Sequence, residues 1–291
     1  MSTIHEEIAI ARQVLRTAGA TASEATLDAR LLAQHALGWD AAKLLSAGLD
    51  QPTPAFVERF TALVARRATH EPLAYIVGVK EFWNLAIAVS PDVLIPRPET
   101  ELLVEVALDR LRGPLANHAL VADVCTGSGC VAIALAVERP DIRIIATDIS
   151  EPALAIAAQN AVRHGVADRI RFVRTDILTG ITERLDLIVS NPPYIPLGDR
   201  PGLQADVRDF EPPLALFGGN DGLDVTRALA EHSSVRLKRG GTLLFECGAG
   251  QERGVRELIA NAAPLTMQGI RSDLQGIPRV AIARLPAAAD A

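Results

Sequence analysis

The sequence predicts an α/β protein with a mostly parallel sheet, preceded by a small helical bundle. From residue 119 onward, strand-like apolar segments alternate with helical segments, a pattern typical of parallel sheets covered by helices on both faces. Before residue 75, apolar residues instead recur at helical spacing. The 291 residues are 49% hydrophobic and 22% charged, which is ordinary for a globular protein and leaves room for two domains.

Residues 1–74 predict the helical bundle. Thr3 and Glu6 form a capping-box pattern at the start of an amphipathic segment, and Thr53 before Pro54 marks another helix start. Two further helical segments are expected at 27–37 and 41–49. Such a bundle serves either as a packing domain or as a docking module for a macromolecule, and the sequence leaves both open.

Residues 75–96 predict a β-hairpin linker, with strands at 75–79 and 85–89 and a turn at Trp83 and Asn84. The main domain then runs from 97 to 291. Its strands are expected at 119–124, 142–147, 170–173, 185–190, 242–246 and 280–284. Its helices are expected at 131–138, 152–164, 225–237 and 251–260.

Charge and composition argue against several classes of protein, among them DNA-binding, membrane-spanning and secreted proteins. The net charge of −6 offers no basic footprint for duplex DNA, so we expect no direct nucleic-acid binding. No apolar run reaches the ~20 residues that a membrane span needs, and the N-terminus has no signal-peptide core. Three cysteines without a CxxC pair fit a reducing cytoplasm, and the histidines form no metal-binding pattern.

A glycine-rich loop predicts a nucleoside pocket. Asp123 ends an apolar strand, and Cys125, Thr126, Gly127, Ser128 and Gly129 lead into a helix. Glycines allow a close approach of backbone to ligand, and ligands of such folds bind at the carboxyl edge of the sheet. Asp148, nineteen residues past Gly129, ends the next strand, where an acid accepts hydrogen bonds from ribose hydroxyls.

The kind of nucleoside stays open at this loop, because the loose dinucleotide pattern is also satisfied. Asp123 favours S-adenosyl-L-methionine, whose ammonium group a carboxylate can receive, over a dinucleotide, whose pyrophosphate it would repel. Asp176 follows another strand and either accepts the exocyclic amine of adenine or is a plain turn residue. Ile177 would pack on the adenine ring.

Asn191, Pro192, Pro193 and Tyr194 follow a buried strand and form the most informative stretch. A conjugated amino group is a poor nucleophile, and it has two N–H donors. The Asn191 side-chain oxygen and the Pro192 carbonyl can accept both, so that the lone pair points at a methyl donor. The prolines stiffen the backbone, and Tyr194 offers a face for stacking. Catalysis would then consist of positioning and electrostatic preorganisation.

The sequence resembles the release-factor glutamine methyltransferases over nearly its whole length. Asn-Pro-Pro-Tyr alone is shared with adenine-amino DNA methyltransferases, but its combination with Pro-Arg-Pro-Glu-Thr at 96–100 is highly specific. The other matching segments are residues 71–78, 81–82, 94–101, 211–216, 222–224 and 273–276.

The resemblance implies a Rossmann-like methyltransferase fold with a mostly parallel seven-stranded sheet. It implies cofactor contacts at residues 125–129, Asp148, Ile177 and Asn191, with the target amide at Asn191, Pro192, Pro193 and Tyr194. Two positions depart from the family pattern: Cys125 and Asn84 stand where relatives have glycine. Arg97 and Glu99 either line the methionine end of the cofactor or form a structural ion pair.

The implied reaction is methyl transfer from S-adenosyl-L-methionine to the glutamine of the Gly-Gly-Gln motif in class-1 peptide-chain release factors. We expect a monomeric cytoplasmic enzyme without a metal. Three alternatives remain: a ribosomal-protein glutamine methyltransferase, an adenine-amino nucleic-acid methyltransferase and a non-catalytic cofactor-binding protein. The arginines at 163, 169, 171 and 174 form a small basic cluster that we interpret as a solvated face.

Overall fold

The computed structural model describes residues 2–112 and 118–287 and divides the chain into two compact units. The helical unit comprises Met1–Val79 together with Gln204–Phe210. The sheet unit comprises Lys80–Leu203 and Glu211–Ala291.

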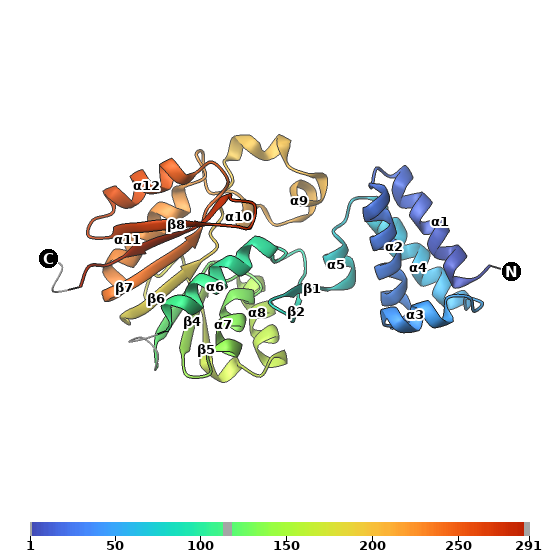
Figure 1. Cartoon of the computed structure of the whole chain (residues 1–291), viewed down its shortest axis with the longest axis horizontal. Coiled ribbons are helices and arrows are strands. Elements are labelled where there is room, and N and C mark those ends of the chain that lie inside the picture. Colours follow the sequence, from blue (N-terminus) through green and yellow to red (C-terminus); the bar gives the residue numbers. More distant parts are fainter. Residues whose placement is uncertain (1, 113–117, 288–291) are drawn as a thin grey trace. The chain divides into compact units, whose positions relative to one another are not determined.

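The helical unit is built from short amphipathic helices around its own core. These are α1 (Ile4–Thr17), α2 (Ala22–Leu37), α3 (Ala41–Ala47), α4 (Pro54–Ala68), α5 (Leu73–Val77) and α9 (Ala205–Phe210) (Figure 1). Thr3 and Thr21 each form a capping box with the glutamate three residues later, and Asp40 and Thr53 cap the next two helices. Leu15, Leu32 and Phe60 are among the side chains fully buried between the helices.

The expected strand at 75–79 is wrong, because residues 73–77 form helix α5. Tyr75, Ile76 and Val77 have strand-like side chains, but the residues around them decide the conformation. Pro72 precedes the first turn, and Gly78 ends it in the left-handed conformation with φ +79°, its N–H donating to the Ala74 carbonyl at 2.8 Å. Burial of Tyr75 and Ile76 stabilises this single turn.

The hairpin is shorter than expected and consists of β1 (Val79–Phe82) and β2 (Leu85–Ala88). Trp83 and Asn84 form its turn, with φ of 53° and 56°, the two positive values that a type I′ hairpin turn requires. Asparagine adopts this conformation more readily than most residues other than glycine, which explains how Asn84 occupies the turn. Glu101 accepts a hydrogen bond from the Trp83 backbone N–H at 2.8 Å and fixes the turn.

The central sheet has seven strands in the order β5-β4-β3-β6-β7-β9-β8. They are β3 (Leu120–Val124), β4 (Arg143–Asp148), β5 (Ile170–Arg174), β6 (Leu185–Ser190), β7 (Leu237–Glu246), β8 (Thr266–Ser272) and β9 (Pro278–Arg284). β9 runs antiparallel to β7 and β8, whereas the other pairs are parallel. The mostly parallel seven-stranded sheet is therefore confirmed.

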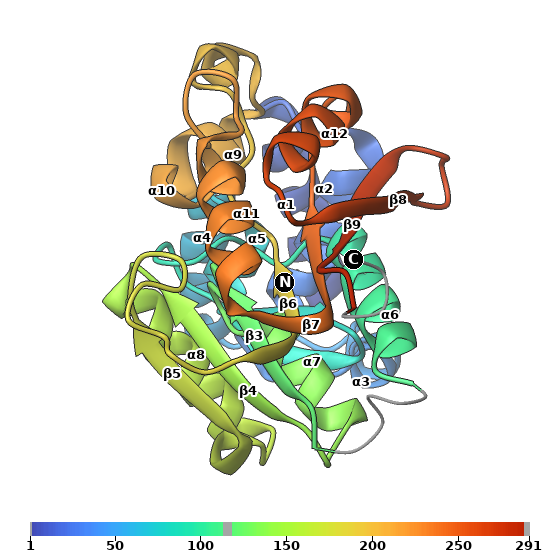
Figure 2. The same ribbon diagram turned by 90° about the vertical axis from the view of Figure 1, so that its left-hand side faces the viewer.

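Helices cover both faces of this sheet. They are α6 (Glu101–Arg110), α7 (Cys130–Glu138), α8 (Glu151–Arg163), α11 (Asp224–Arg236) and α12 (Glu252–Asn261). The short helix α10 (Pro213–Leu216) belongs to the same unit. Figures 1 and 2 show α6, α7 and α8 on one face and α11 and α12 on the other. The core between sheet and helices contains Ile188, Leu229, Leu243, Phe245 and Ile259.

The strand order places two candidate segments side by side. Strands β4 and β5 continue the sheet on one side of β3, and β6 and β7 continue it on the other. From β3 the chain adds strands toward one edge of the sheet, and from β6 it adds them toward the other. Open α/β sheets bind ligands at their carboxyl edge at this point, where the strand order reverses. Val124 pairs with Ser190 in the sheet register, so the loop after β3 and the segment after β6 leave the sheet as neighbours.

Candidate functional site

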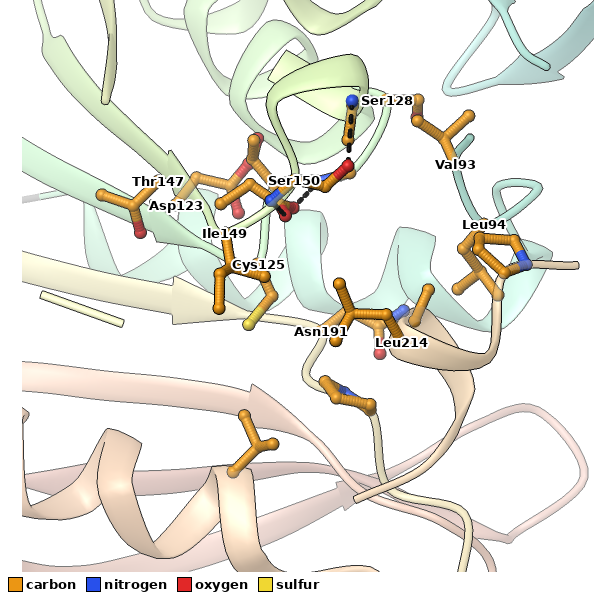
Figure 3. Close-up of a pocket in the computed structure, with 18 of the residues that line it drawn as sticks. Val93, Leu94, Asp123, Cys125, Ser128, Thr147, Ile149, Ser150, Asn191 and Leu214 are labelled. Atoms are coloured by element: carbon orange, nitrogen blue, oxygen red, sulfur yellow. Dashed lines mark hydrogen bonds between the residues drawn. The ribbon is translucent and has the colours of Figure 1, made fainter. Parts of the chain in front are cut away.

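A cavity of about 210 Å³ opens at the carboxyl edge of β3, β4 and β6 in the sheet unit. Figure 3 shows Asp123, Cys125 and Ser128 on one side of it and Asn191 and Leu214 facing them. The remaining wall is largely apolar, with Val93, Leu94, Ile149, Ile177, Pro212, Phe217 and Val225 among its side chains.

Asp123 is the most deeply placed charged residue of the cavity wall and is only 2% exposed. Its Oδ2 accepts hydrogen bonds from the Thr126 hydroxyl at 2.6 Å and from the Ala132 N–H at 3.1 Å. Among the described residues, none donates to Oδ1. Burial raises the pKa of this carboxyl to about 7, against the lowering effect of its two hydrogen bonds. One oxygen is thus left for a cationic ligand group.

The glycine-rich loop is held in place by Asp148 at the end of β4. One oxygen of Asp148 accepts from the Gly127 N–H at 2.9 Å and the other accepts from the Ser150 N–H at 2.9 Å. Gly129 has φ +80°, and a Cβ atom there would lie 3.0 Å from the Ala157 Cβ, so only glycine lets the loop pack on α8. Cys125 also has a positive φ, of 59°, a conformation that is strained for a residue other than glycine.

Asp176 and Ile177 follow β5 and line the same cavity. Ile177 has φ +52°, an outlier for a β-branched residue. The buried Thr147 hydroxyl donates to the Ile177 carbonyl at 2.8 Å and holds this conformation. The isoleucine side chain is thereby presented to the cavity wall, where a flat ring can pack against it.

The segment Asn191–Tyr194 is fixed through its backbone. Gln251 donates from Nε2 to the Tyr194 carbonyl at 2.9 Å. Gly222 passes so close that a Cβ atom there would lie 2.2 Å from the same oxygen. Among the described residues, none donates to the Pro192 carbonyl or to Asn191 Oδ1. Two acceptors in a rigid segment are therefore available to an NH₂ group.

A buried polar chain lies behind this segment. Asn191 Nδ2 donates to the Thr100 hydroxyl at 3.1 Å, and Thr100 donates to Glu246 Oε2 at 2.8 Å. Tyr194 donates from its hydroxyl to Glu246 Oε1 at 3.1 Å. Glu246 is 1% exposed; burial raises its pKa, and the hydrogen bonds from Thr100 and Tyr194 oppose that rise.

Most of the predicted site residues line this one cavity. They are Asp123, Cys125, Thr126, Gly127, Ser128, Asp148, Asp176, Ile177, Asn191 and Pro193. Gly129, Pro192 and Tyr194 are not part of its wall: Gly129 packs on α8, and Tyr194 turns its hydroxyl to Glu246. The roles of all these residues stay predictions.

Arg97 and Glu99 do not pair with each other. Arg97 instead forms an ion pair with Glu211, which is buried and also accepts from the Ile95 N–H. Of the four basic residues at 163–174, Arg171 pairs with Glu183 and Arg174 with Glu151, so these two side chains lie in local ion pairs rather than forming a basic groove.

Sequence reasoning missed three residues of the site. Thr100 was noticed only as part of a motif, and Glu246 only as the end of a strand. An acid at the carboxyl end of a strand adjacent to β6 was the available signal for Glu246. Asn160, on α8, is fully buried and gave no signal: Oδ1 accepts from the Ala88 N–H at 2.8 Å, and Nδ2 donates to the Ala88 and Ser128 carbonyls at 3.0 Å each.

The described residues contain neither a candidate membrane span nor a candidate metal centre. No helix there is sufficiently long and apolar to cross a bilayer. Nor does the described part of the chain bring three or more His, Cys, Asp or Glu side chains together in a way that could hold a metal ion.

Two family models match the chain. Residues 7–78 match the PrmC N-terminal domain, and residues 99–199 match the methyltransferase small domain. Curated relatives called release factor glutamine methyltransferase align along almost the full length. The relative from Cereibacter sphaeroides is 45% identical over 96% of this chain and 98% of its own, and the one from Burkholderia pseudomallei is 40% identical over 98% and 100%.

Solved structures agree with the fold. The catalytic domain of hMettl16 in complex with an RNA hairpin has a TM-score of 0.56 at 16% identity, covering 78% of this chain and 83% of that one. A methyltransferase from Pyrococcus furiosus has a TM-score of 0.52 at 17% identity, covering 71% and 92%. At these identities the likeness concerns architecture alone.

Proposed function

The chain belongs to the release factor glutamine methyltransferase family, and on this premise we propose that it methylates the Gly-Gly-Gln glutamine of class-1 peptide-chain release factors. The methyl group goes from S-adenosyl-L-methionine to the side-chain amide nitrogen. The observation that carries the proposal is the pair of free acceptors, Asn191 Oδ1 and the Pro192 carbonyl, on a fixed segment beside the cavity.

The residues that line the cavity fit S-adenosyl-L-methionine, which supplies the methyl group on a positively charged sulfur. Asp123 has an oxygen for the ammonium group, and Asp148 stands at the next strand end, where ribose hydroxyls would bind. The apolar wall with Ile177 and Leu214 suits the adenine ring. Cys125 and residues 126–128 bring backbone close to the ligand, because the loop turns in left-handed conformations.

The protein contributes positioning to the reaction. An amide NH₂ is planar and weakly nucleophilic because its lone pair is delocalised into the carbonyl. Asn191 Oδ1 and the Pro192 carbonyl accept its two hydrogens and orient the nitrogen toward the methyl donor. These acceptors also stabilise the positive charge that develops on the nitrogen. The proton leaves after transfer, so no residue has to act as a base beforehand.

The remaining expectations belong to the same proposal. We expect a monomeric enzyme in the cytoplasm that binds no nucleic acid directly. The ion pairs of Arg171 and Arg174 support this, because they leave less free positive charge for a phosphate backbone. A glutamine of a ribosomal protein is the competing substrate, since the chemistry at the amide would be the same.

Transfer of tritiated methyl from S-adenosyl-L-methionine tests the proposal. A purified release factor should be labelled, and the same factor with its Gly-Gly-Gln glutamine replaced by alanine should not. Incubation with whole-cell extract then separates a release factor, a ribosomal protein and nucleic acid by the size and nature of the labelled species. Undiminished labelling of the glutamine-free factor would refute the assignment.

A further inference from the structure

The amide of Asn191 has to present its oxygen, not its nitrogen, to the substrate. The two ends of a carboxamide are nearly the same size, so packing alone does not select between them. Reversal of the amide would point an NH₂ donor at the NH₂ group of the glutamine and abolish the proposed interaction. Something in the structure must therefore set the orientation.

The series of buried hydrogen bonds behind Asn191 sets the orientation of its amide. Glu246 accepts hydrogen bonds from both Thr100 and Tyr194, one on each carboxylate oxygen. These two bonds favour its ionised form against the effect of burial, and an ionised carboxylate can only accept. A threonine hydroxyl has a single proton. Because that proton goes to Glu246, Thr100 can only accept on its other side. It accepts from Asn191 Nδ2 at 3.1 Å, and this leaves Oδ1 as the free end of the amide.

We propose that Thr100 and Glu246 are positioning residues that hold the Asn191 amide with its oxygen toward the target amide. The inference rests on the proposed function for the identity of that target. The orientation itself follows from contacts within the sheet unit. Thr100 comes from the turn before α6 and Glu246 from the end of β7, so the device joins two elements to the segment after β6.

A purely structural role is the competing explanation. Thr100 and Glu246 are both buried, and their loss would disturb packing whatever Asn191 does. The two explanations predict different effects of substitution on turnover and on cofactor affinity. Positioning affects turnover with little change in cofactor affinity, and it depends on the hydroxyl rather than on the shape of the side chain.

Substitutions at Thr100 separate the two. Thr100→Val keeps the shape but removes the acceptor, so kcat should fall at least tenfold while the Kd for the cofactor stays within about twofold. Thr100→Ser keeps the hydroxyl and should retain kcat within about threefold. Thr242→Val is the matched control, because Thr242 is also buried and lies on β7, outside the cavity wall. Wild-type kcat in Thr100→Val would overturn the proposal.

Glu246→Gln tests whether Glu246 sets the direction of the hydrogen bonds that orient the Asn191 amide. Its amide can accept from only one of the two hydroxyls and must donate to the other. In the orientation in which it donates to Thr100, the threonine proton turns to Asn191 and the Asn191 amide reverses, so kcat should fall at least threefold. When Thr100→Val is already present, Glu246→Gln should lower kcat much less than it does alone, because Glu246 acts on Asn191 through Thr100. An unchanged kcat in the single variant, or fully multiplicative losses in the pair, would exclude Glu246 from the device.

Side-chain NMR gives a readout that needs no methyl transfer. In protein labelled with ¹⁵N-asparagine, the Asn191 NH₂ signals are assigned by their loss in Asn191→Ser. Their hydrogen exchange should be slow in the wild type and faster in Thr100→Val, with no change in Thr242→Val. Equal exchange in all three would refute the orientation. If the wild type labels no release factor while the NMR result holds, the proposed function fails and the positioning device stands.

Discussion

At the scale of single residues, the site contains backbone conformations that its side chains disfavour. Cys125 and Ile177 both have positive φ, and both line the cavity. Such non-glycine residues cost on the order of 1–3 kcal/mol each, and they persist where surrounding contacts fix them. Thr147 provides one such contact by donating to the Ile177 carbonyl. Strain is thus concentrated where the ligand would bind.

Substitution of Cys125 tests this strain. Cys125→Gly should leave the free energy of unfolding within about 1 kcal/mol of the wild type, because relief of the left-handed conformation, ~1–2 kcal/mol, offsets the lost side-chain contacts. Cys125→Val adds a β-branch in the same conformation and should lower it by about 2 kcal/mol or more. Urea unfolding measures both. A valine variant as stable as the glycine variant would show that φ at this position is not strained.

The buried Asp123 carboxyl should make the stability of the ligand-free protein depend on pH. Burial raises its pKa to about 7, above the ~3.9 of an unfolded chain, so the folded protein favours the neutral acid. Its contribution to stability is present in full below the unfolded value and is lost as pH rises through about 7. Between pH 5 and pH 8, the free energy of unfolding of the wild type should therefore fall relative to that of Asp123→Asn. A constant difference would contradict the shift.

The same carboxyl should give cofactor binding the opposite pH trend. If its ionised form receives the ammonium group, affinity should rise roughly tenfold between pH 6 and pH 8, as ionisation passes through the pKa. Calorimetric titration with S-adenosyl-L-methionine measures this. Asp123→Asn should bind more weakly and show a flatter profile. Asp148→Asn should keep this dependence of affinity on pH. If Asp148→Asn loses the dependence and Asp123→Asn keeps it, the titrating group is Asp148.

At the scale of elements, Asn160 links three segments that are far apart in sequence. From α8 it bonds both backbone groups of Ala88 in β2 and the Ser128 carbonyl of the glycine-rich loop. The hairpin and the loop are thus fixed by one fully buried side chain. A buried amide that satisfies three backbone groups has no apolar substitute, because its removal leaves those groups unpaired.

Asn160→Ala should therefore lower the free energy of unfolding by about 2–3 kcal/mol and weaken cofactor binding. Asn160→Asp is the informative companion, because it keeps an acceptor for the Ala88 N–H but loses both donors, including the one to Ser128. Thermal unfolding and cofactor titration on both variants measure the two effects. Cofactor affinity at the wild-type level in both would show that the loop holds its conformation without Asn160.

Elements with a strong local pattern were predictable and the others were not. The strands ending at Val124 and Ser190 are mostly apolar and almost entirely buried, since helices cover both faces of the sheet there, and their positions were predicted. β8 was missed because it is an edge strand with Gln268, Gly269 and Arg271 and little burial. Helix α6 was also missed, although Glu101 and Arg110 stand at its ends.

The candidate site divides in the same way. Residues that follow a strand or form a glycine loop, such as Asp123 and Asn191, are visible from local sequence. Thr100 and Glu246 are 146 positions apart and meet only in the folded protein, so no local pattern connects them. Cys125 is an intermediate case, because the resemblance marks it as a departure from glycine, whereas the sign of its φ is known only from the structure.

At the scale of the whole molecule, the two units have separate hydrophobic cores. Every residue of the cavity wall belongs to the sheet unit, as do all members of its core. The helical unit has its own core of residues from α1 to α5. The wall of the cavity therefore contains no residue of the helical unit, and we expect that unit to contribute to recognition of the protein substrate.

A shortened chain beginning at Lys80, which keeps only Gln204–Phe210 of the helical unit, tests this division of labour. It should bind S-adenosyl-L-methionine within about threefold of the full chain, whereas its KM for a release factor should rise at least tenfold, about 1.4 kcal/mol of lost docking. A short Gly-Gly-Gln peptide, which has no further surface for the helical unit to bind, is the control and should be methylated by both chains at similar kcat/KM. If the shortened chain loses cofactor and peptide activity together, the helical unit stabilises the enzyme and does not serve as a docking module.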